Sequence, residues 1–204
     1  ACTSLKCLAY DVNNGAPFID ANRRRPVFVP DDIHKLNGYA SVHYDPSAHP
    51  ERRHIAVVRD PEARFRSAFL NRVHGFKDLE SNPGVRRRVA RLGLESRPAL
   101  QRFVEDFDRY MKVSATLRHH FEPMAQFVGE DLRALEFACD VKRIDRLQDY
   151  LSEALGRPVE VPQLNEGGDG AVDVDMSLSA KAQDRLAQLI EPDTRLMATA
   201  ELSA

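Results

Sequence analysis

The sequence predicts an α/β protein in which helices flank a central parallel sheet. Two short apolar segments, at residues 55–58 and 135–139, are typical of buried strands because they are brief and rich in Ile, Val, Leu and Phe. Each is followed by apolar residues at helical spacing, which is the strand-then-helix order of parallel sheets. The length of 204 residues suits one domain with a substantial core, so we expect residues 1–204 to form a single domain.

The first part of the chain predicts helix, loop and a second short helix. Residues 3–8 begin a helix, and residues 11–30 are rich in Asn, Pro and Arg, which is typical of an irregular loop. Asp31 and Asp32 predict the start of a short helix that reaches Leu36. Residues 39–44 alternate enough for a strand or a turn.

The segment around residues 55–73 changes from strand to helix. Asp60 and Pro61 follow the first apolar run and Arg59, and they form a helix start in which Asp is the N-cap and Pro the first helical residue. Phe65 and Phe69 then recur at helical spacing. Three further arginines lie in the same segment: Arg64, Arg66 and Arg72. Because ligands of open α/β sheets bind beyond the carboxyl ends of the strands, this order places cationic and hydroxyl groups at a binding edge.

The remaining elements are predicted to be mostly helical. Residues 85–92 form a helix with an arginine cluster, and residues 96–98 (Ser-Arg-Pro) start a helix whose apolar stripe runs to Met111. After the second strand, residues 144–155 form an amphipathic helix that ends at Gly156. Residues 167–175 form a mobile Gly/Asp loop without the register of a calcium site, and a last helix covers 180–190.

Composition favours a globular protein that does not bind nucleic acid. Apolar residues make up 43% and charged residues 29%, which is ordinary for a globular chain. The net charge of −2 predicts no general affinity for nucleic acid, although arginines cluster at 23–25 and 86–91 and acids between 160 and 175.

The cysteines indicate a reducing compartment. Cys2, Cys7 and Cys139 are an odd number without C-x-x-C spacing, which fits neither a disulfide framework nor a zinc site. No apolar run reaches transmembrane length and no leader opens the sequence. We therefore expect a bacterial cytoplasmic protein without a membrane anchor or membrane partner.

One motif resembles a known family. Residues 58–61 (Val-Arg-Asp-Pro), Arg64 and Ser67 are similar to the V-R-D-P-x-x-R-x-x-S signature of sulfotransferases, most closely of the carbohydrate (Golgi-type, family 2) branch. The resemblance implies a P-loop-like fold. It also implies that Arg59 and Ser67 bind the 3′-phosphate of the donor PAPS (3′-phosphoadenosine 5′-phosphosulfate), for which an arginine fork and a hydroxyl are well suited. A capped helix with solvated arginines is the alternative interpretation of the same residues.

The N-terminal residues resemble the second half of the family's P-K-x-x-x-T-S loop, which cradles the 5′-phosphosulfate. The resemblance implies that Cys2, Thr3 and Ser4 contact that group, where helix N–H groups and hydroxyls form an anion site. The family's first strand and loop lysine would precede Ala1 and are missing from this sequence. A plain helix cap is the alternative for Thr3 and Ser4.

Three histidines are candidates for the base that accepts the proton of the acceptor hydroxyl. His34 and His43 lie between the two donor motifs, and the unperturbed pKa of histidine, ~6.5, suits this role. His120 and Pro123 match the family's H-x-x-P-Q element, in which Met124 replaces Gln. The adjacent pair His119 and His120 does not predict a metal site, and none is expected.

The resemblance implies sulfuryl transfer from PAPS, with PAP (3′-phosphoadenosine 5′-phosphate) as product and no metal. The acceptor would be a hydroxyl of a small molecule or glycan, most fittingly a carbohydrate, and the arginines at 86–91 would suit an anionic one. Two alternatives remain: another P-loop-type nucleotide enzyme such as a small kinase, and a non-catalytic nucleotide- or polyanion-binding module. The sequence contains no G-x-x-x-x-G-K-[ST] motif, which argues against the kinase.

Overall fold

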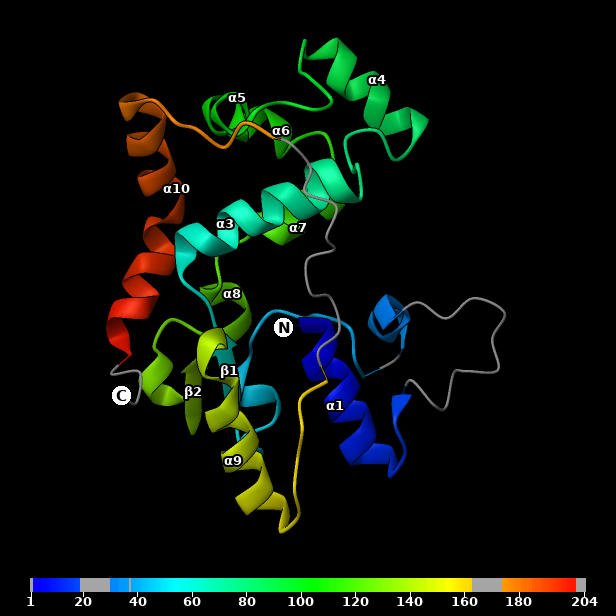
Figure 1. Cartoon of the computed structure of the whole chain (residues 1–204), viewed down its shortest axis with the longest axis vertical. Coiled ribbons are helices and arrows are strands. Elements are labelled where there is room, and N and C mark those ends of the chain that lie inside the picture. Colours follow the sequence, from blue (N-terminus) through cyan, green and yellow to red (C-terminus); the bar gives the residue numbers. More distant parts are fainter. Residues whose placement is uncertain (1, 19–29, 37, 163–173, 201–204) are drawn as a thin grey trace. The chain divides into compact units, whose positions relative to one another are not determined.

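The structure is a computed structural model that describes residues 2–18, 30–36, 38–162 and 174–200 (Figure 1). The helices and strands are α1 (Cys2–Asn14), η1 (Pro30–Lys35), η2 (Pro46–Ala48), β1 (Ile55–Val58), α3 (Pro61–Phe69), the π-helical η3 (Leu70–Gly75), α4 (Pro83–Arg91), α5 (Leu100–Glu105), α6 (Phe107–Tyr110), α7 (Ala115–Phe121), α8 (Ala125–Val128), η4 (Leu132–Ala134), β2 (Phe137–Asp140), η5 (Val141–Arg143), α9 (Ile144–Leu155) and α10 (Ala180–Thr199).

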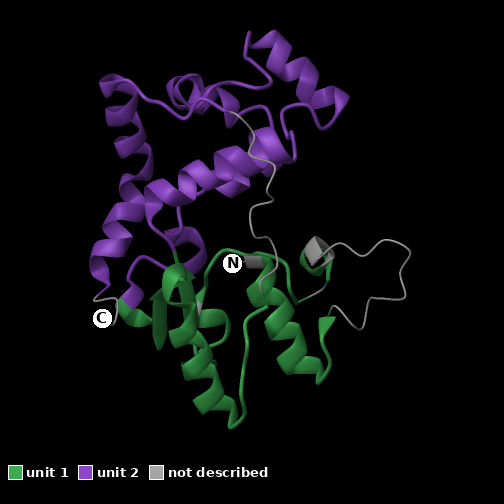
Figure 2. Cartoon of the chain, in the orientation of Figure 1, with its two compact units in different colours: residues 1–58, 133–169, 201–204 green, residues 59–132, 170–200 purple. Residues whose placement is uncertain are grey.

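The chain divides into two compact units (Figure 2). Unit 1 comprises residues 1–58, 133–169 and 201–204, and unit 2 comprises residues 59–132 and 170–200. Helices together with a small parallel sheet confirm the α/β class. The P-loop-like topology and the single domain remain predictions.

The sheet of unit 1 is formed by β1 and β2, which run parallel in the described part of the chain. Their register pairs Ile55 with Phe137 and Val58 with Asp140. Ala56 and Val58 are buried, but Ile55 is 39% exposed, so the prediction of a strand buried on both faces is wrong at its first residue. β2 begins at Phe137, two residues later than predicted. The residue before it, Glu136, donates its backbone N–H to the His54 carbonyl at 2.9 Å.

Helix α9 follows β2 and packs against it (Figure 1). Its bounds match the predicted helix, and Gly156 ends it in the left-handed conformation with φ +64°, which glycine adopts without strain. Leu147 is fully buried, and the rings of Tyr150 and Phe137 stack with centroids 4.6 Å apart. The helix therefore covers the sheet with its apolar face.

A second part of unit 1 is built by α1 and η1. Cys7, Phe18 and Ile33 are buried together, and Tyr10 and Tyr39 pack at the edge of this cluster. The predicted helix at 31–36 is present as the 3-10 helix η1. The strand considered for residues 39–44 does not form, because residues 41–43 are exposed and offer no apolar face to bury.

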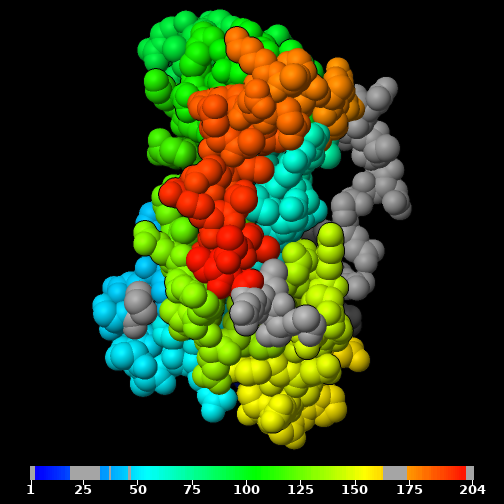
Figure 3. Space-filling model, turned by 90° about the vertical axis from the view of Figure 1, so that its left-hand side faces the viewer, coloured from blue at the N-terminus to red at the C-terminus, as the bar shows by residue number. Residues whose placement is uncertain are grey.

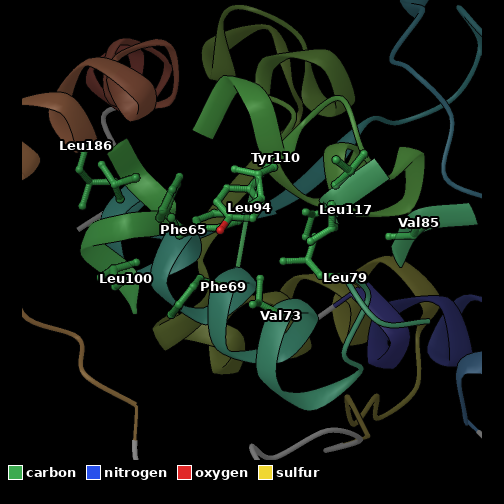
Figure 4. Packing of buried hydrophobic residues seen from close by; sticks show 14 residues of the cluster. Phe65, Phe69, Val73, Leu79, Val85, Leu94, Leu100, Tyr110, Leu117 and Leu186 are labelled. Atoms are coloured by element: carbon green, nitrogen blue, oxygen red, sulfur yellow. The ribbon is translucent and has the colours of Figure 1, made fainter. Parts of the chain in front are cut away.

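Unit 2 is organised around an aromatic and aliphatic core (Figure 4). Phe65 and Phe69 come from α3 and lie against Phe103 of α5, with the Phe69 and Phe103 ring centroids 5.1 Å apart. Tyr110 is fully buried beside Phe103, with centroids 4.9 Å apart. The predicted apolar stripes of these helices therefore form the core.

The predicted helix from residues 96–98 to Met111 is two helices instead. Ser96 does not cap it, since its hydroxyl donates to Glu80, and α5 begins at Leu100 without a side-chain cap. Asp106 leaves helical geometry with φ −100° and ψ +16°, which separates α5 from α6. Its carboxylate accepts from Arg109 of α6 at 2.7 Å.

Helix α10 is longer than predicted and reaches Thr199. Ser179 caps its N-terminus, and the helix continues through Pro192. It contacts α3 and α5 within unit 2, and Figure 3 shows it in orange to red on the surface of this unit. The extra turns are favoured because they bury Leu196, which is 2% exposed, and bring Asp193 into an ion pair with Arg64 at 2.8 Å. No helix in the described ranges is both long and apolar enough to span a membrane.

Two predicted features lie outside the described residues. These are the arginine cluster at 23–25 and residues 163–173 of the acidic loop.

Candidate functional site

The start of α3 carries the first group of candidate residues. Strand β1 ends at Val58, and Arg59 leads directly to the N-cap Asp60, whose Oδ1 accepts from the Ala63 N–H at 2.8 Å. Pro61 is the first helical residue, where its missing N–H costs nothing. The predicted capped helix start is confirmed, and it places Arg59 between the end of β1 and the N-cap of α3.

The arginines that follow Arg59 are engaged in ion pairs. Arg64 and Arg72 pair with Asp193 and Asp78, each at 2.8 Å, and both arginines are largely buried. Arg66 pairs with Glu62 one turn earlier, also at 2.8 Å. The alternative interpretation of these residues as solvated arginines therefore does not hold for any of the three.

Arg59 and Ser67 differ from these neighbours. Arg59 is exposed, and within the described part of the chain its guanidinium forms no ion pair or hydrogen bond. The half-buried Ser67 hydroxyl likewise has no hydrogen bond among the described residues. Both belong to unit 2, and Ser67 lies about 9 Å along the α3 axis from Pro61 at ~1.5 Å per residue. An arginine fork and a hydroxyl on this helix are thus available to an external anion.

Arg64 connects α3 to two other parts of unit 2. Its second nitrogen donates to the Glu122 carbonyl at 2.6 Å and, more weakly, to the His120 carbonyl at 3.5 Å. The other oxygen of Asp193 accepts from the Met124 N–H at 2.6 Å. The second arginine of the signature thus holds together α3, the turn after α7 and α10.

Burial dominates the electrostatics of this ion pair. Desolvation raises the pKa of the Asp193 carboxyl, and the attraction of Arg64 opposes this shift only in part. Desolvation likewise lowers the pKa of Arg64 against the attraction of Asp193. Sequence reasoning did not identify the pair, because the predicted last helix ended at residue 190, before Asp193.

The N-terminal candidates lie in unit 1, in the first turn of α1. Thr3 and Ser4 are buried, at 6% and 9% exposure, and the side chain of Cys2 lies outside the described part. Thr3 Oγ1 is 3.1 Å from His34 Nε2, and Lys6 Nζ is 3.0 Å from His34 Nδ1. The structure therefore brings together Thr3 and His34, and it adds Lys6, which sequence reasoning missed.

The three candidate bases have different surroundings. His34 lies in this cluster, while His43 is exposed in the irregular segment that follows η1 in unit 1. His120 is exposed near the end of α7 in unit 2, and its neighbour His119 is 3.0 Å from a carboxylate oxygen of Glu122. No group of three or more metal-ligating side chains occurs within the described ranges.

A shallow hollow of about 480 Å³ lies in unit 1, before the amino ends of both strands. Its lining is Tyr44, Pro50, Arg52, Arg53, His54, Ala134, Leu135 and Glu136. Arg53 pairs with Glu136 at 3.1 Å there. None of the candidate site residues that the structure describes lines this hollow. Its position at the amino ends is also opposite to the carboxyl ends of the strands, where ligands of open α/β sheets bind.

Comparisons with known proteins agree with the motif at residues 58–67. A family model described as "Sulfotransferase family" matches residues 1–198, which is nearly the whole chain. No curated protein and no solved structure matches significantly. Because the family match spans far more than half of the sequence, the chain belongs to the sulfotransferase family, whose members transfer sulfuryl groups.

Proposed function

We propose that this protein is a PAPS-dependent sulfotransferase with a P-loop-like fold that acts on a hydroxyl, most fittingly of a carbohydrate. Family membership supports sulfuryl transfer, and the resemblance of residues 58–67 to the donor-binding signature supports PAPS. Arg59 and Ser67 bind the 3′-phosphate. Cys2, Thr3 and Ser4 bind the 5′-phosphosulfate.

The reaction is an in-line displacement at sulfur. The acceptor oxygen forms a bond to sulfur, the bond between sulfur and the bridging oxygen of PAPS breaks, and that oxygen leaves with PAP. The hydroxyl proton passes to a base, for which His34, His43 and His120 are the candidates. By analogy with phosphoryl transfer, positioning and stabilisation of the leaving oxygen supply most of the catalysis. The scheme requires no metal.

One observation carries the donor assignment. Of the four arginines between residues 59 and 72 in the described structure, three are held in ion pairs, whereas Arg59 is exposed and uncommitted. A guanidinium without an internal counter-ion and a hydroxyl without a hydrogen bond, both in the described segment that leads from β1 into α3, are suited to a phosphate. These two groups support the assignment of the 3′-phosphate to this segment.

The acceptor and the compartment complete the proposal. Arg86, Arg87 and Arg91 are exposed on α4 and would suit an anionic glycan. The buried thiols of Cys7 and Cys139, which form no disulfide in the described structure, support the expectation of a reducing, cytoplasmic environment.

The test compares Arg59→Ala with Arg87→Ala, a matched exposed arginine on α4. Calorimetric titration measures the Kd of PAP, of 5′-AMP and of ATP with Mg²⁺. We expect Arg59→Ala to weaken PAP binding more than tenfold, because a hydrogen bond to a charged group contributes about 1.5–3 kcal/mol, and Arg87→Ala to leave it unchanged.

Other outcomes would favour the alternatives. A preference for ATP with Mg²⁺ over PAP would indicate a kinase. Equal losses in the two variants, with steep salt dependence, would indicate a polyanion-binding module. An Arg59→Ala variant that binds PAP as tightly as the wild type would contradict the assigned role of Arg59.

A further inference from the structure

We propose that Lys6 and His34 are positioning residues that direct the Thr3 hydroxyl as a hydrogen-bond donor toward the 5′-phosphosulfate. The inference rests on the proposed function and deepens its 5′ half. It assigns two side chains that contact no reacting atom but determine the direction in which a donor-binding hydroxyl points.

The direction of the hydrogen bonds follows from Lys6. An ammonium group only donates, so at 3.0 Å from Lys6 Nζ the Nδ1 atom of His34 is an acceptor and carries no proton. A neutral imidazole with an unprotonated Nδ1 carries its proton on Nε2. This Nε2–H then donates to Thr3 Oγ1 at 3.1 Å.

The consequence for Thr3 is a fixed hydroxyl direction. Because its oxygen accepts from His34, its own proton points away from the imidazole. Thr3 lies in the first turn of α1, where backbone N–H groups have no acceptor within the helix and favour anions. Hydrogen bonds that run in one direction from a cation polarise one another, which strengthens the Thr3 hydroxyl as a donor.

The three residues meet through tertiary structure. Lys6 and Thr3 belong to α1 and His34 to η1, which packs against α1. Lys6 also donates to Ser41 Oγ at 2.9 Å, which ties the segment after η1 to the same ammonium. Thr3 is only 6% exposed, so its hydroxyl has little freedom to reorient.

This geometry gives His34 a role other than general base. A base needs an unprotonated nitrogen directed at the acceptor hydroxyl. In His34, Nε2 is protonated and donates this proton to Thr3 Oγ1. The assignment leaves His43 and His120 as candidates for the base.

The test measures nucleotides that carry one phosphate each. Calorimetry gives the Kd of 5′-AMP, of adenosine 3′-phosphate and of PAP for the wild type and for Lys6→Met, His34→Leu and His34→Gln. We expect Lys6→Met and His34→Leu to weaken the binding of 5′-AMP and of PAP about tenfold and to leave the binding of adenosine 3′-phosphate unchanged. His34→Gln restores binding, since its amide can both accept from Lys6 and donate to Thr3. Lys142→Met, an exposed lysine of unit 1 outside the cluster, is the matched control.

A double-mutant cycle tests whether the effect passes through Thr3. Thr3→Val keeps the shape and removes the hydroxyl, so adding His34→Leu to Thr3→Val should cause no further loss of 5′-AMP binding. Additive losses would overturn the inference. So would equal weakening of all three nucleotides, which indicates general loosening of unit 1.

A spectroscopic measurement on the wild type does not depend on whether Lys6→Met and His34→Leu fold. Long-range ¹H–¹⁵N spectra of the wild type, with the His34 signals assigned through His34→Gln, should show protonation at Nε2 alone. A proton on Nδ1 would overturn the inference.

Failure of the proposed function has a separate signature. In that case the wild type does not prefer PAP over 5′-AMP, or Arg59→Ala leaves adenosine 3′-phosphate binding unchanged. If both of those results are normal but the Lys6 and His34 variants bind 5′-AMP like the wild type, the inference alone fails.

Discussion

Individual side chains of one type have very different roles in this protein, depending on their counter-ions. Arg59 and Arg64 are five residues apart in one signature, yet Arg64 is bound to Asp193 and Arg59 is exposed without a partner in the described structure. An arginine without an internal partner retains its donors for a ligand, while the donors of a paired one are occupied within the fold.

The ionisation of Tyr110 is linked to stability. Burial raises the pKa of its phenol to about 12, and its hydroxyl donates to the Glu95 carbonyl at 3.0 Å. In the unfolded chain the phenol ionises near its ordinary value of 10.0. Between these two values the unfolded state loses the proton first, so stability should fall as pH rises from about 10 to 12.

The measurement is urea unfolding across this alkaline range for the wild type and Tyr110→Phe. The variant loses about 1 kcal/mol at pH 8 with the hydrogen bond, but it should show a shallower alkaline decline. An equally steep decline in both proteins would mean that Tyr110 is not the group responsible.

At the scale of elements, α3, the turn after α7 and α10 are joined by one buried ion pair. Asp193 is 4% exposed and accepts from both Arg64 and the Met124 N–H. Removing one partner would leave an uncompensated buried charge. We expect Asp193→Ala to lower the free energy of unfolding by about 3–5 kcal/mol.

The companion variant replaces both charges at once. Because burial raises the Asp193 pKa and lowers the Arg64 pKa, both charges lie in surroundings that disfavour them. Arg64→Met combined with Asp193→Leu should therefore recover most of the loss when measured by urea unfolding. A double variant as unstable as Asp193→Ala would show that the hydrogen bonds to the backbone, not the charges, dominate.

At the scale of the molecule, two buried thiols report on unit 1. Cys7 lies in the cluster of α1 and η1, and Cys139 lies on β2. Burial also raises the pKa of the Cys139 thiol, which lowers the fraction of reactive thiolate.

We expect both thiols to react slowly with an alkylating reagent in the native protein and rapidly in urea. Mass spectrometry of peptides assigns the label to each cysteine. Rapid native labelling of Cys7 would show that the packing of α1 against η1 opens readily, and rapid labelling of Cys139 would show the same for the sheet.

Local patterns in the sequence determined the elements and the family. The cap at Asp60 and Pro61, the glycine end of α9 and the inward stripes of α3 and α10 depend on residues close in sequence, so they could be predicted. The family signature at residues 58–67 could be recognised for the same reason, and the match over residues 1–198 confirms it.

Tertiary structure alone decided which side chains meet. The extension of α10 and the pairs Arg64–Asp193 and His34–Thr3 depend on contacts between residues that are distant in sequence. A residue's type fixes its charge and its donors, but the partners that satisfy them are set by packing. For that reason the signature in the sequence contains both Arg59 and Arg64 without distinguishing them. Only the fold showed that Arg59 is exposed and that Arg64 is held by Asp193.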